Sequence, residues 1–271
     1  MGHITWEQLP AEARAAVEKL IGPVVKVEAV REGRRSAVAV IVHTGTGRAF
    51  IKGAPREDAT AAAQLDREAA VGALAATVAP PLVLDVTVGG WRLLGHEVVD
   101  GQRASLSPGS PDVQAVVEAL AHLGSVTVPA ENRGGLLWFE KRWSHYAPAA
   151  RDLAALAGAT LLHTDLNPGN ILVAGGRASL VDWGMASIGA GYANPADLVI
   201  NLIAAGHHPR DAEAAVAGLP AWASTAPETL DGYARLIAST WLYAFWSIRH
   251  PWTDVTVAAA QRWALHRRGT L

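Results

Sequence analysis

The sequence has no cysteine among its 271 residues, which excludes disulfide bonds, thiolate metal ligands and cysteine nucleophiles. The chain also lacks an excess of charge of one sign: the formal net charge is −2, which gives no electrostatic reason to expect a nucleic-acid or membrane-surface partner. No apolar run is long enough to span a bilayer, and the N-terminal segment does not read as a secretory signal. We therefore expect a cytoplasmic protein that binds neither nucleic acid nor membrane.

What is present is the composition of an ordinary folded protein. Hydrophobic residues make up 50% of the chain and charged residues 18%. A chain of this length can bury a sizeable core, either as one large domain or as two lobes. The ten tryptophans either pack in that core or line a pocket for an apolar or ring-shaped ligand.

The first hundred residues show a β-rich pattern. A capping box at Thr5 and Gln8 is followed by apolar residues at helical spacing as far as Gly22. Short runs rich in β-branched residues then predict a small antiparallel sheet, with a hairpin loop at 44–47. The predicted strands are 24–30, 37–42, 49–52, 82–86 and 91–99, with an alanine-rich helix over 58–76.

The remainder of the chain is mostly helical. Short strands at 171–173 and 179–181 are the exception, and from Pro195 onward the helical pattern is broken only near three later prolines. A shift in composition at 100–109 marks a boundary between lobes. We therefore expect an α+β protein with lobes at residues 1–100 and 101–271.

One stretch of the second lobe carries the strongest chemical signal. Residues 161–173 read LLHTDLNPGNILV, which places His163, Asp165 and Asn170 in the pattern H-x-D-x-x-x-x-N. Asp182 follows in the tripeptide D-W-G, after a second apolar run. A single aspartate in a turn is usually a cap or a solvated loop residue. The order and spacing of the whole set favour a functional interpretation.

This set resembles the motifs of the protein-kinase-like superfamily, and in detail it is similar to aminoglycoside phosphotransferases and related small-molecule kinases. The resemblance extends from about Val24 to Asp197. It implies a bilobal protein-kinase-like fold: a nucleotide-binding N-terminal lobe with a small antiparallel sheet and a helix, and a larger, mostly helical lobe for catalysis and substrate binding.

The resemblance also implies roles for the motif residues, with ATP and Mg²⁺ as cofactors. Asp165 would orient the acceptor hydroxyl and take its proton. Asn170 and Asp182 would supply hard oxygen ligands for Mg²⁺ between the phosphates. His163 would brace the loop and not act as a catalyst.

The N-terminal lobe contains matching residues. Lys52 ends an apolar strand where the family keeps a lysine for the α- and β-phosphates, although a lysine at a strand end is by itself usually solvated. Glu68 in the alanine-rich helix would pair with Lys52, with Asp66 and Glu57 as competing partners.

The remaining nucleotide contacts are also implied by the resemblance. Gly33 and Ser36 occupy the loop where kinases carry a glycine-rich motif, here reduced to one glycine, so a plain hairpin turn remains an alternative. The backbone of Glu97 and Val99 would bond the nucleobase at the hinge, which does not exclude GTP as the donor. Asp197 matches a family aspartate at a helix start, or is an ordinary N-terminal helix charge.

The acceptor is expected to be a small hydroxylated molecule. Protein kinases usually carry arginine before the catalytic aspartate, whereas this chain has Thr164, and no A-P-E motif follows the D-W-G tripeptide. An aminoglycoside or another antibiotic is one candidate acceptor, which would make the protein an antibiotic-resistance enzyme. A metabolic kinase for a sugar or amino alcohol and a non-catalytic nucleotide-binding pseudokinase are the alternatives. We expect the protein to be a monomer.

Overall fold

The computed structural model describes residues 3–30, 36–142, 144, 153–247 and 251–270. The chain divides into two compact units. The first comprises Met1–Asp100 together with Asp182–Met185, and the second comprises Gly101–Val181 together with Ala186–Leu271. The D-W-G tripeptide therefore packs with the first unit, although the chain segments on both sides of it belong to the second.

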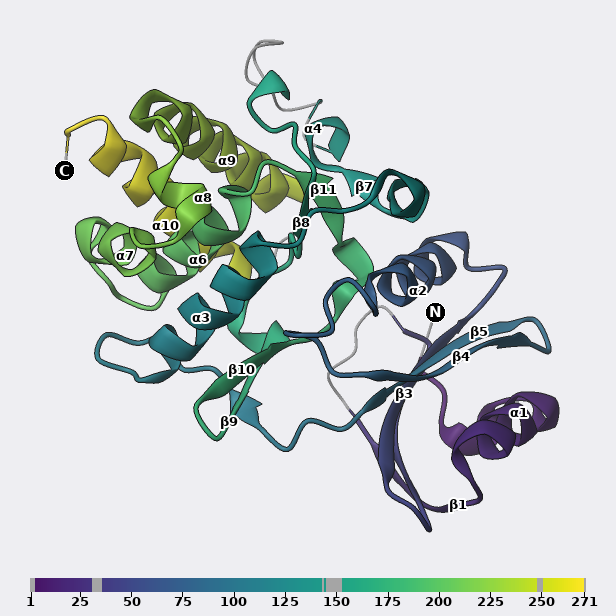
Figure 1. Ribbon diagram of the computed structural model, residues 1–271. Coiled ribbons are helices and arrows are strands. Elements are labelled where there is room, and N and C mark those ends of the chain that lie inside the picture. Colours follow the sequence, from purple (N-terminus) through teal and green to yellow (C-terminus); the bar gives the residue numbers. More distant parts are fainter. Residues whose placement is uncertain (1–2, 31–35, 143, 145–152, 248–250, 271) are drawn as a thin grey trace. The chain divides into compact units, whose positions relative to one another are not determined.

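The first unit is built on an antiparallel five-stranded sheet with the order β1-β2-β3-β5-β4 (Figure 1). Thr44 N–H donates to Gly47 O at 2.8 Å and closes the predicted hairpin. Gly89 and Gly90, with φ of 57° and 73°, supply the positive dihedrals that a two-residue hairpin turn requires. The strands are β1 (Val24–Ala29), β2 (Val38–Thr44), β3 (Arg48–Pro55), β4 (Leu82–Val88) and β5 (Trp91–Glu97).

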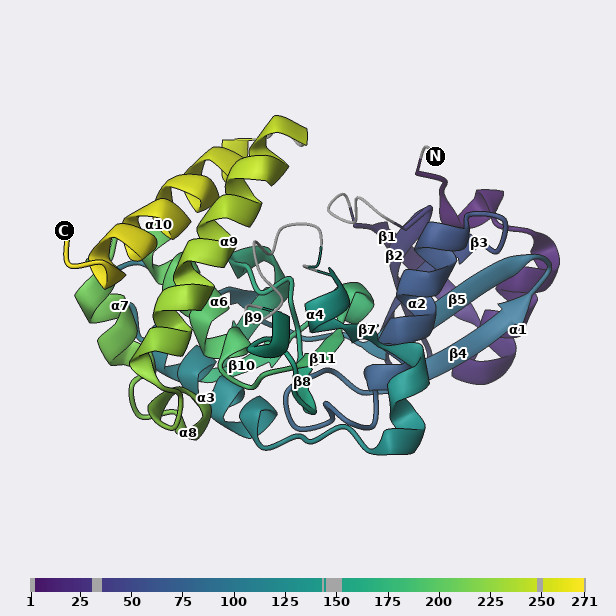
Figure 2. The same cartoon turned by 90° about the horizontal axis from the view of Figure 1, so that it is seen from above.

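Two helices cover opposite faces of this sheet, α1 (Ala11–Ile21) and α2 (Ala59–Val71) (Figure 2). Side chains alternate along each strand, so neighbouring residues join different cores. Ile51 packs in the core that includes α1, whereas Ala54 packs in the core that includes α2. Lys52 therefore shares the α2 face of β3.

The first helix begins later than the capping box predicts. Thr5 N–H donates to Gln8 Oε1 at 2.7 Å, but this cap serves only the 3₁₀ turn η1 (Trp6–Gln8). Pro10 lacks an N–H and separates the turn from α1. The helix ends, as predicted, at Gly22, whose φ of 93° suits glycine.

The second unit contains two small sheets with the orders β10-β9-β6 and β7-β11-β8. Of these strands only β9 and β10 are predicted from the sequence, because strands of two or three residues are too short to show alternation. Their bounds are β6 (Gln102–Arg103), β7 (Leu137–Trp138), β8 (Thr160–Leu162), β9 (Ile171–Ala174), β10 (Arg177–Leu180) and β11 (Ser187–Gly189).

Helices make up most of the second unit, and α9 and α10 lie side by side (Figure 2). The four helices from α7 onward each begin with proline, which the first helical turn tolerates. The bounds are α3 (Asp112–Gly124), α4 (Phe139–Arg142), α6 (Ala193–Ala204), α7 (Pro209–Val216), α8 (Pro220–Ala223), α9 (Pro227–Ser247) and α10 (Pro251–Arg267), with 3₁₀ turns η2 (Ala130–Gly135), η3 (Pro168–Asn170) and η4 (Trp183–Met185). The predicted α+β class is confirmed. No helix in the described part of the chain combines the length and apolar character that crossing a membrane requires.

Candidate functional site

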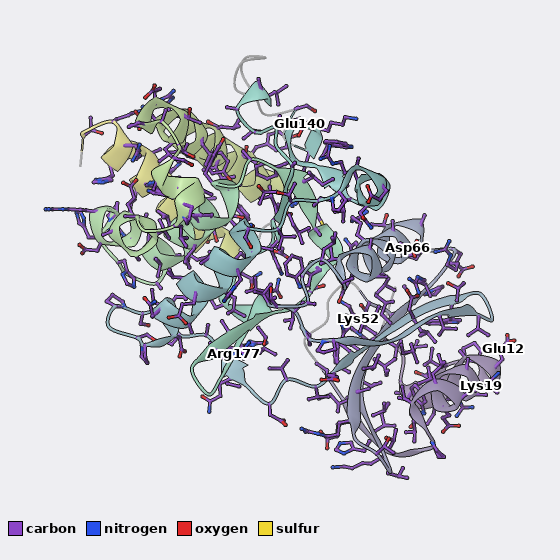
Figure 3. The ribbon with its side chains drawn as sticks, viewed as in Figure 1. Glu12, Lys19, Lys52, Asp66, Glu140 and Arg177 are labelled. Atoms are coloured by element: carbon purple, nitrogen blue, oxygen red, sulfur yellow. The ribbon has the colours of Figure 1, made fainter. Side chains whose placement is uncertain are left out.

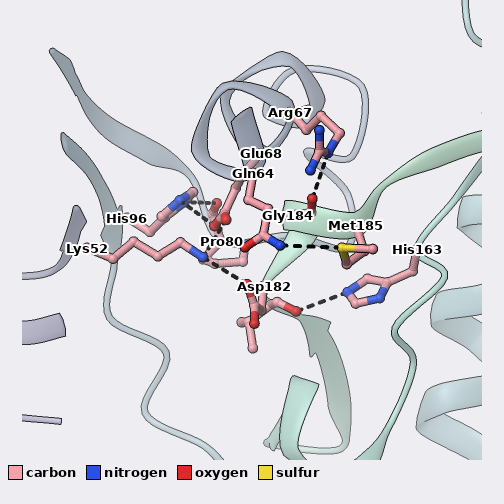
Figure 4. A network of polar contacts seen from close by, with 11 residues as sticks. Lys52, Gln64, Arg67, Glu68, Pro80, His96, His163, Asp182, Gly184 and Met185 are labelled. Atoms are coloured by element: carbon pink, nitrogen blue, oxygen red, sulfur yellow. Dashed lines mark hydrogen bonds and ion pairs between the residues drawn. The ribbon is translucent and has the colours of Figure 1, made fainter. Parts of the chain in front are cut away.

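A buried lysine is the centre of the polar network in the first unit (Figure 4). The Lys52 side chain is only 8% exposed, and its Nζ forms an ion pair with Glu68. Nζ also lies 3.1 Å from Asp182 Oδ1. Burial by itself lowers the pKa of Lys52, but the charges of Glu68 and Asp182 outweigh it, so the pKa lies above its ordinary value. Lys52 is thus held as a cation.

Glu68 is the acidic residue of α2 that lies beside Lys52. Its side chain is 4% exposed, and Oε1 lies 3.1 Å from His96 Nε2 on β5. Burial alone raises the pKa of Glu68, but Lys52 and His96 lower it more, so the carboxylate stays ionised. The competing candidate Asp66 lies on the same helix (Figure 3) but pairs with Arg56 and Arg92.

Asp182 occupies a strained position at the start of the D-W-G turn. Its φ is 62°, in the left-handed region that non-glycine residues seldom adopt. Such a residue costs about 1–3 kcal/mol, so surrounding contacts must hold it in place. The side chain is 54% exposed, while Trp183 and Gly184 behind it are buried. The Asp182 carboxylate is thus exposed to solvent, while the two residues that follow it in the turn are buried.

In the second unit, a fully buried histidine organises the loop after β8. His163 Nε2–H donates to Val181 O at 3.0 Å, since a carbonyl can only accept. Nδ1 is then the acceptor, and Asp165 N–H points to it at 3.4 Å. The His163 ring therefore braces the loop between the end of β10 and the backbone of Asp165.

The loop from Asp165 to Asn170 is fixed by its own asparagines. Asn170 Nδ2 donates to Asp165 O at 2.8 Å, and Asn167 Nδ2 donates to the same carbonyl at 3.0 Å. Asn167 Oδ1 caps the turn η3 by accepting from Gly169 N–H at 2.9 Å. These bonds engage the Asn170 amide nitrogen, which leaves Oδ1 as the atom with the chemistry of a metal ligand.

Thr164 supports the same loop from the other side. Its φ is 55°; among the described residues, only Thr164 and Asp182 are non-glycine residues with positive φ. Arg142 of α4 donates to Thr164 Oγ1 at 2.7 Å.

Burial raises the pKa of the nearby Asp197 to about 7, an effect that the Arg142 charge opposes and the Asp165 charge reinforces. The charge of Asp165, the candidate base, thus contributes to the raised pKa of Asp197.

Sequence reasoning missed Asn194, which joins α6 to β8. Its side chain is 1% exposed; Oδ1 accepts from His163 N–H and Nδ2 donates to Leu161 O, both at 3.0 Å. A polar residue inside the apolar run that opens α6 was the available signal, because buried amides need partners.

The other described candidates for nucleotide binding lie at or near the ends of strands β2 and β5. Glu97 ends β5 and donates its N–H to Pro81 O at 2.9 Å, so its carbonyl is the group suited to a ligand donor. Val99 follows two residues later, half-buried, and Ser36 precedes β2, also half-buried. Gly33 lies outside the described residues.

The side-chain oxygens of the candidate site suit Mg²⁺ that is also bound by substrate phosphates. They do not suit a metal whose ligands all come from the protein. In the described residues no three His, Cys, Asp or Glu side chains gather as a metal cluster. Mg²⁺ in phosphate-transferring sites is usually held by one or two carboxylates and by substrate phosphates. Asp182 in the first unit supplies such a carboxylate, and Asn170 in the second unit supplies a neutral amide oxygen.

Comparisons with known proteins agree on a family and a fold. The model of the phosphotransferase enzyme family, APH, matches residues 26–233. No curated protein matches the sequence significantly.

Solved structures with the same fold cover nearly the whole chain. A thermostable mutant of aminoglycoside phosphotransferase APH(4)-Ia, in ternary complex with AMP-PNP and hygromycin B, is 14% identical with a TM-score of 0.60, covering 96% of this chain and 98% of that one. Choline kinase LicA from Streptococcus pneumoniae is 13% identical with a TM-score of 0.62, covering 96% and 98%. A putative fructosamine-3-kinase from Haemophilus somnus 129PT is 11% identical with a TM-score of 0.63, covering 93% and 96%. The predicted kinase-like fold is confirmed.

Proposed function

This chain belongs to the phosphotransferase enzyme family, and we propose that it transfers the γ-phosphate of ATP to a hydroxyl group of a small molecule. The observation that carries the proposal is the pairing of buried Lys52 with both Glu68 and Asp182. In kinases a lysine–glutamate pair and a metal-binding aspartate must both be in place for phosphoryl transfer. A similar structure adds support, since it holds the ATP analogue AMP-PNP.

In this proposal residues 1–100 form the nucleotide-binding lobe. The cationic Lys52 binds phosphate oxygens, and Gly33 and Ser36 are assigned to nucleotide binding. The carbonyl of Glu97 and the backbone of Val99 bond the nucleobase. Asp182 and Asn170 are the side chains that would hold Mg²⁺, and the chemistry that the ion would supply is neutralisation of charge on the phosphates.

Residues 101–271 then form the catalytic and substrate lobe. Asp165 orients the acceptor hydroxyl and receives its proton. The acceptor oxygen bonds to the γ-phosphorus while the bond from phosphorus to the β–γ bridging oxygen breaks, which releases ADP. His163 and Asn170 fix the backbone of Asp165, so the carboxylate is positioned before the acceptor arrives.

The test separates transfer from binding. Asp165→Asn keeps the size of the side chain and removes the base, so transfer should fall by about 10²–10⁴-fold while calorimetric affinity for ATP with Mg²⁺ is retained. Unchanged turnover in Asp165→Asn would refute the assignment. The acceptors to screen are aminoglycosides, other hydroxylated antibiotics, sugars and amino alcohols. Hygromycin B, choline and fructosamine are natural first choices, given the names of the similar proteins.

A further inference from the structure

Helix α2 contacts the D-W-G turn through side chains that face it (Figure 4). Arg67 Nε–H donates to Gly184 O at 2.8 Å. One helical turn earlier, Gln64 Nε2 lies 3.7 Å from Met185 Sδ. A Cβ placed on Gly184 would lie 3.1 Å from Gln64 Cβ, so the turn sits directly on the helix surface. The helix that carries Glu68 therefore also carries the support of the turn.

The Arg67 contact differs from an ordinary surface ion pair. Its guanidinium is half-buried and bonds a backbone carbonyl instead of a carboxylate. Burial lowers the pKa of Arg67, with only partial compensation from the charge of Asp66. Removing the charge from water has a cost, and the contact it makes is a charge-assisted hydrogen bond to the turn.

The turn needs such support because Asp182 has a positive φ of 62°. Backbone in this region persists only when neighbouring contacts determine it. Lys52 holds the Asp182 side chain, and Arg67 holds the carbonyl of Gly184. The side chain and the backbone of the turn are thus fixed separately, from β3 and from α2.

Other residues connect α2 to the sheet. Asp66 accepts from Arg92 Nε at 2.6 Å and from Arg56 Nη1 at 2.9 Å, and Arg92 also pairs with Asp85 of β4. None of these contacts reaches the D-W-G turn. Substitutions can therefore separate an effect on the helix from an effect on the turn.

We propose that Arg67 is a positioning residue that holds the D-W-G turn on α2 and so keeps the Asp182 carboxylate oriented for Mg²⁺. The proposal rests on the proposed function, which gives Asp182 its metal. Residues that orient a metal ligand typically contribute about 10–100-fold to metal affinity. Helix α2 then carries both Glu68, the partner of Lys52, and Arg67, which supports the turn of the metal ligand Asp182.

Four proteins test the proposal: the wild type, Arg67→Met, Arg67→Lys and the matched control Arg56→Gln. ATP affinity is measured by calorimetry across a Mg²⁺ titration. We expect Arg67→Met to raise the half-saturating Mg²⁺ concentration by about tenfold or more, to leave metal-free ATP affinity unchanged, and to be partly rescued in Arg67→Lys, which keeps one donor. Arg56→Gln should match the wild type.

Hydrogen–deuterium exchange of the metal-free proteins gives a second readout that needs no nucleotide. Amides of residues 182–185 should exchange faster in Arg67→Met than in the wild type or Arg56→Gln. Unchanged exchange in Arg67→Met, or an equal Mg²⁺ shift in Arg56→Gln, would overturn the positioning role. A wild type that binds no ATP would instead contradict the proposed function, and the exchange comparison would still decide the role of Arg67.

Discussion

Replacing Lys52 by methionine should destabilise the protein because it leaves a buried carboxylate without its main counter-ion. Glu68 is 4% exposed, and His96 is its other close partner in the described residues. Removing one member of a buried ion pair costs about 3–5 kcal/mol, because the remaining charge stays out of water. We expect a loss of that size in the free energy of unfolding of Lys52→Met.

The same structure predicts that Glu68→Leu has opposite effects in two backgrounds. In the wild type it removes the main partner of Lys52, which is 8% exposed and whose other ion-pair partner among the described residues is the half-exposed Asp182, so it should destabilise. In Lys52→Met it replaces an uncompensated buried charge with an apolar side chain. Replacing both members of a buried pair by apolar residues is often neutral or stabilising. Glu68→Leu should therefore stabilise Lys52→Met.

Urea unfolding of the four proteins at pH 7, followed by tryptophan fluorescence, measures this cycle. A second readout is pH. The folded-state pKa of Glu68 is lowered, so its contribution is present above the unfolded value of about 4.3 and is lost as pH falls through the folded value. The double variant should lack this loss. If Glu68→Leu destabilises both backgrounds equally, the reasoning from the buried pair is wrong.

Three further outcomes follow from the structure. Gly184→Ala places a Cβ 3.1 Å from a side chain of α2 and should weaken Mg²⁺-dependent ATP binding by calorimetry, whereas Gly218→Ala, with nothing within 4 Å, should not. The pKa of Asp197 is raised to about 7, so the folded state holds a proton that the unfolded state releases near pH 4, and stability falls as pH rises between these values. Denaturation across that range should show the fall in the wild type and lose it in Asp197→Asn. Asn194→Ala removes two hydrogen bonds to the buried backbone of the β8 region and should cost about 1–3 kcal/mol for each in urea unfolding; a loss near zero would show that water replaces the amide.

Much of the fold could be predicted because the hydrophobic periodicity and the positions of glycine and proline indicate the same elements along the chain. The runs of β-branched residues gave the strands of the first unit, and proline marks the starts of α7, α8 and α10 as expected. The predicted phosphotransferase family is confirmed by the family match, and the kinase-like fold is confirmed by the similar structures. A small-molecule acceptor stays a proposal. The proposed roles of individual residues stay predictions.

The residues that escaped prediction act on the backbone. Arg67 bonds a carbonyl far along the chain, Asn194 bonds the backbone around β8, and Arg142 reaches both the carbonyl and the hydroxyl of Thr164. A sequence pattern marks apolar faces and motif spacing, but it does not mark a side chain whose partner is a distant peptide group. The positive φ of Thr164 could not be predicted either, because β-branched residues such as threonine disfavour that region.

The most direct test of the central claim is identification of the product. The purified protein is incubated with Mg²⁺ and ATP labelled in the γ-phosphate, with each acceptor of the panel in turn, and labelled products are identified by mass spectrometry. We expect a phosphate ester on a hydroxyl of one acceptor class, and we expect no such ester with Asp165→Asn. Tight binding of ATP with no labelled ester from any acceptor class, and equal ATP consumption by the wild type and Asp165→Asn, would contradict it.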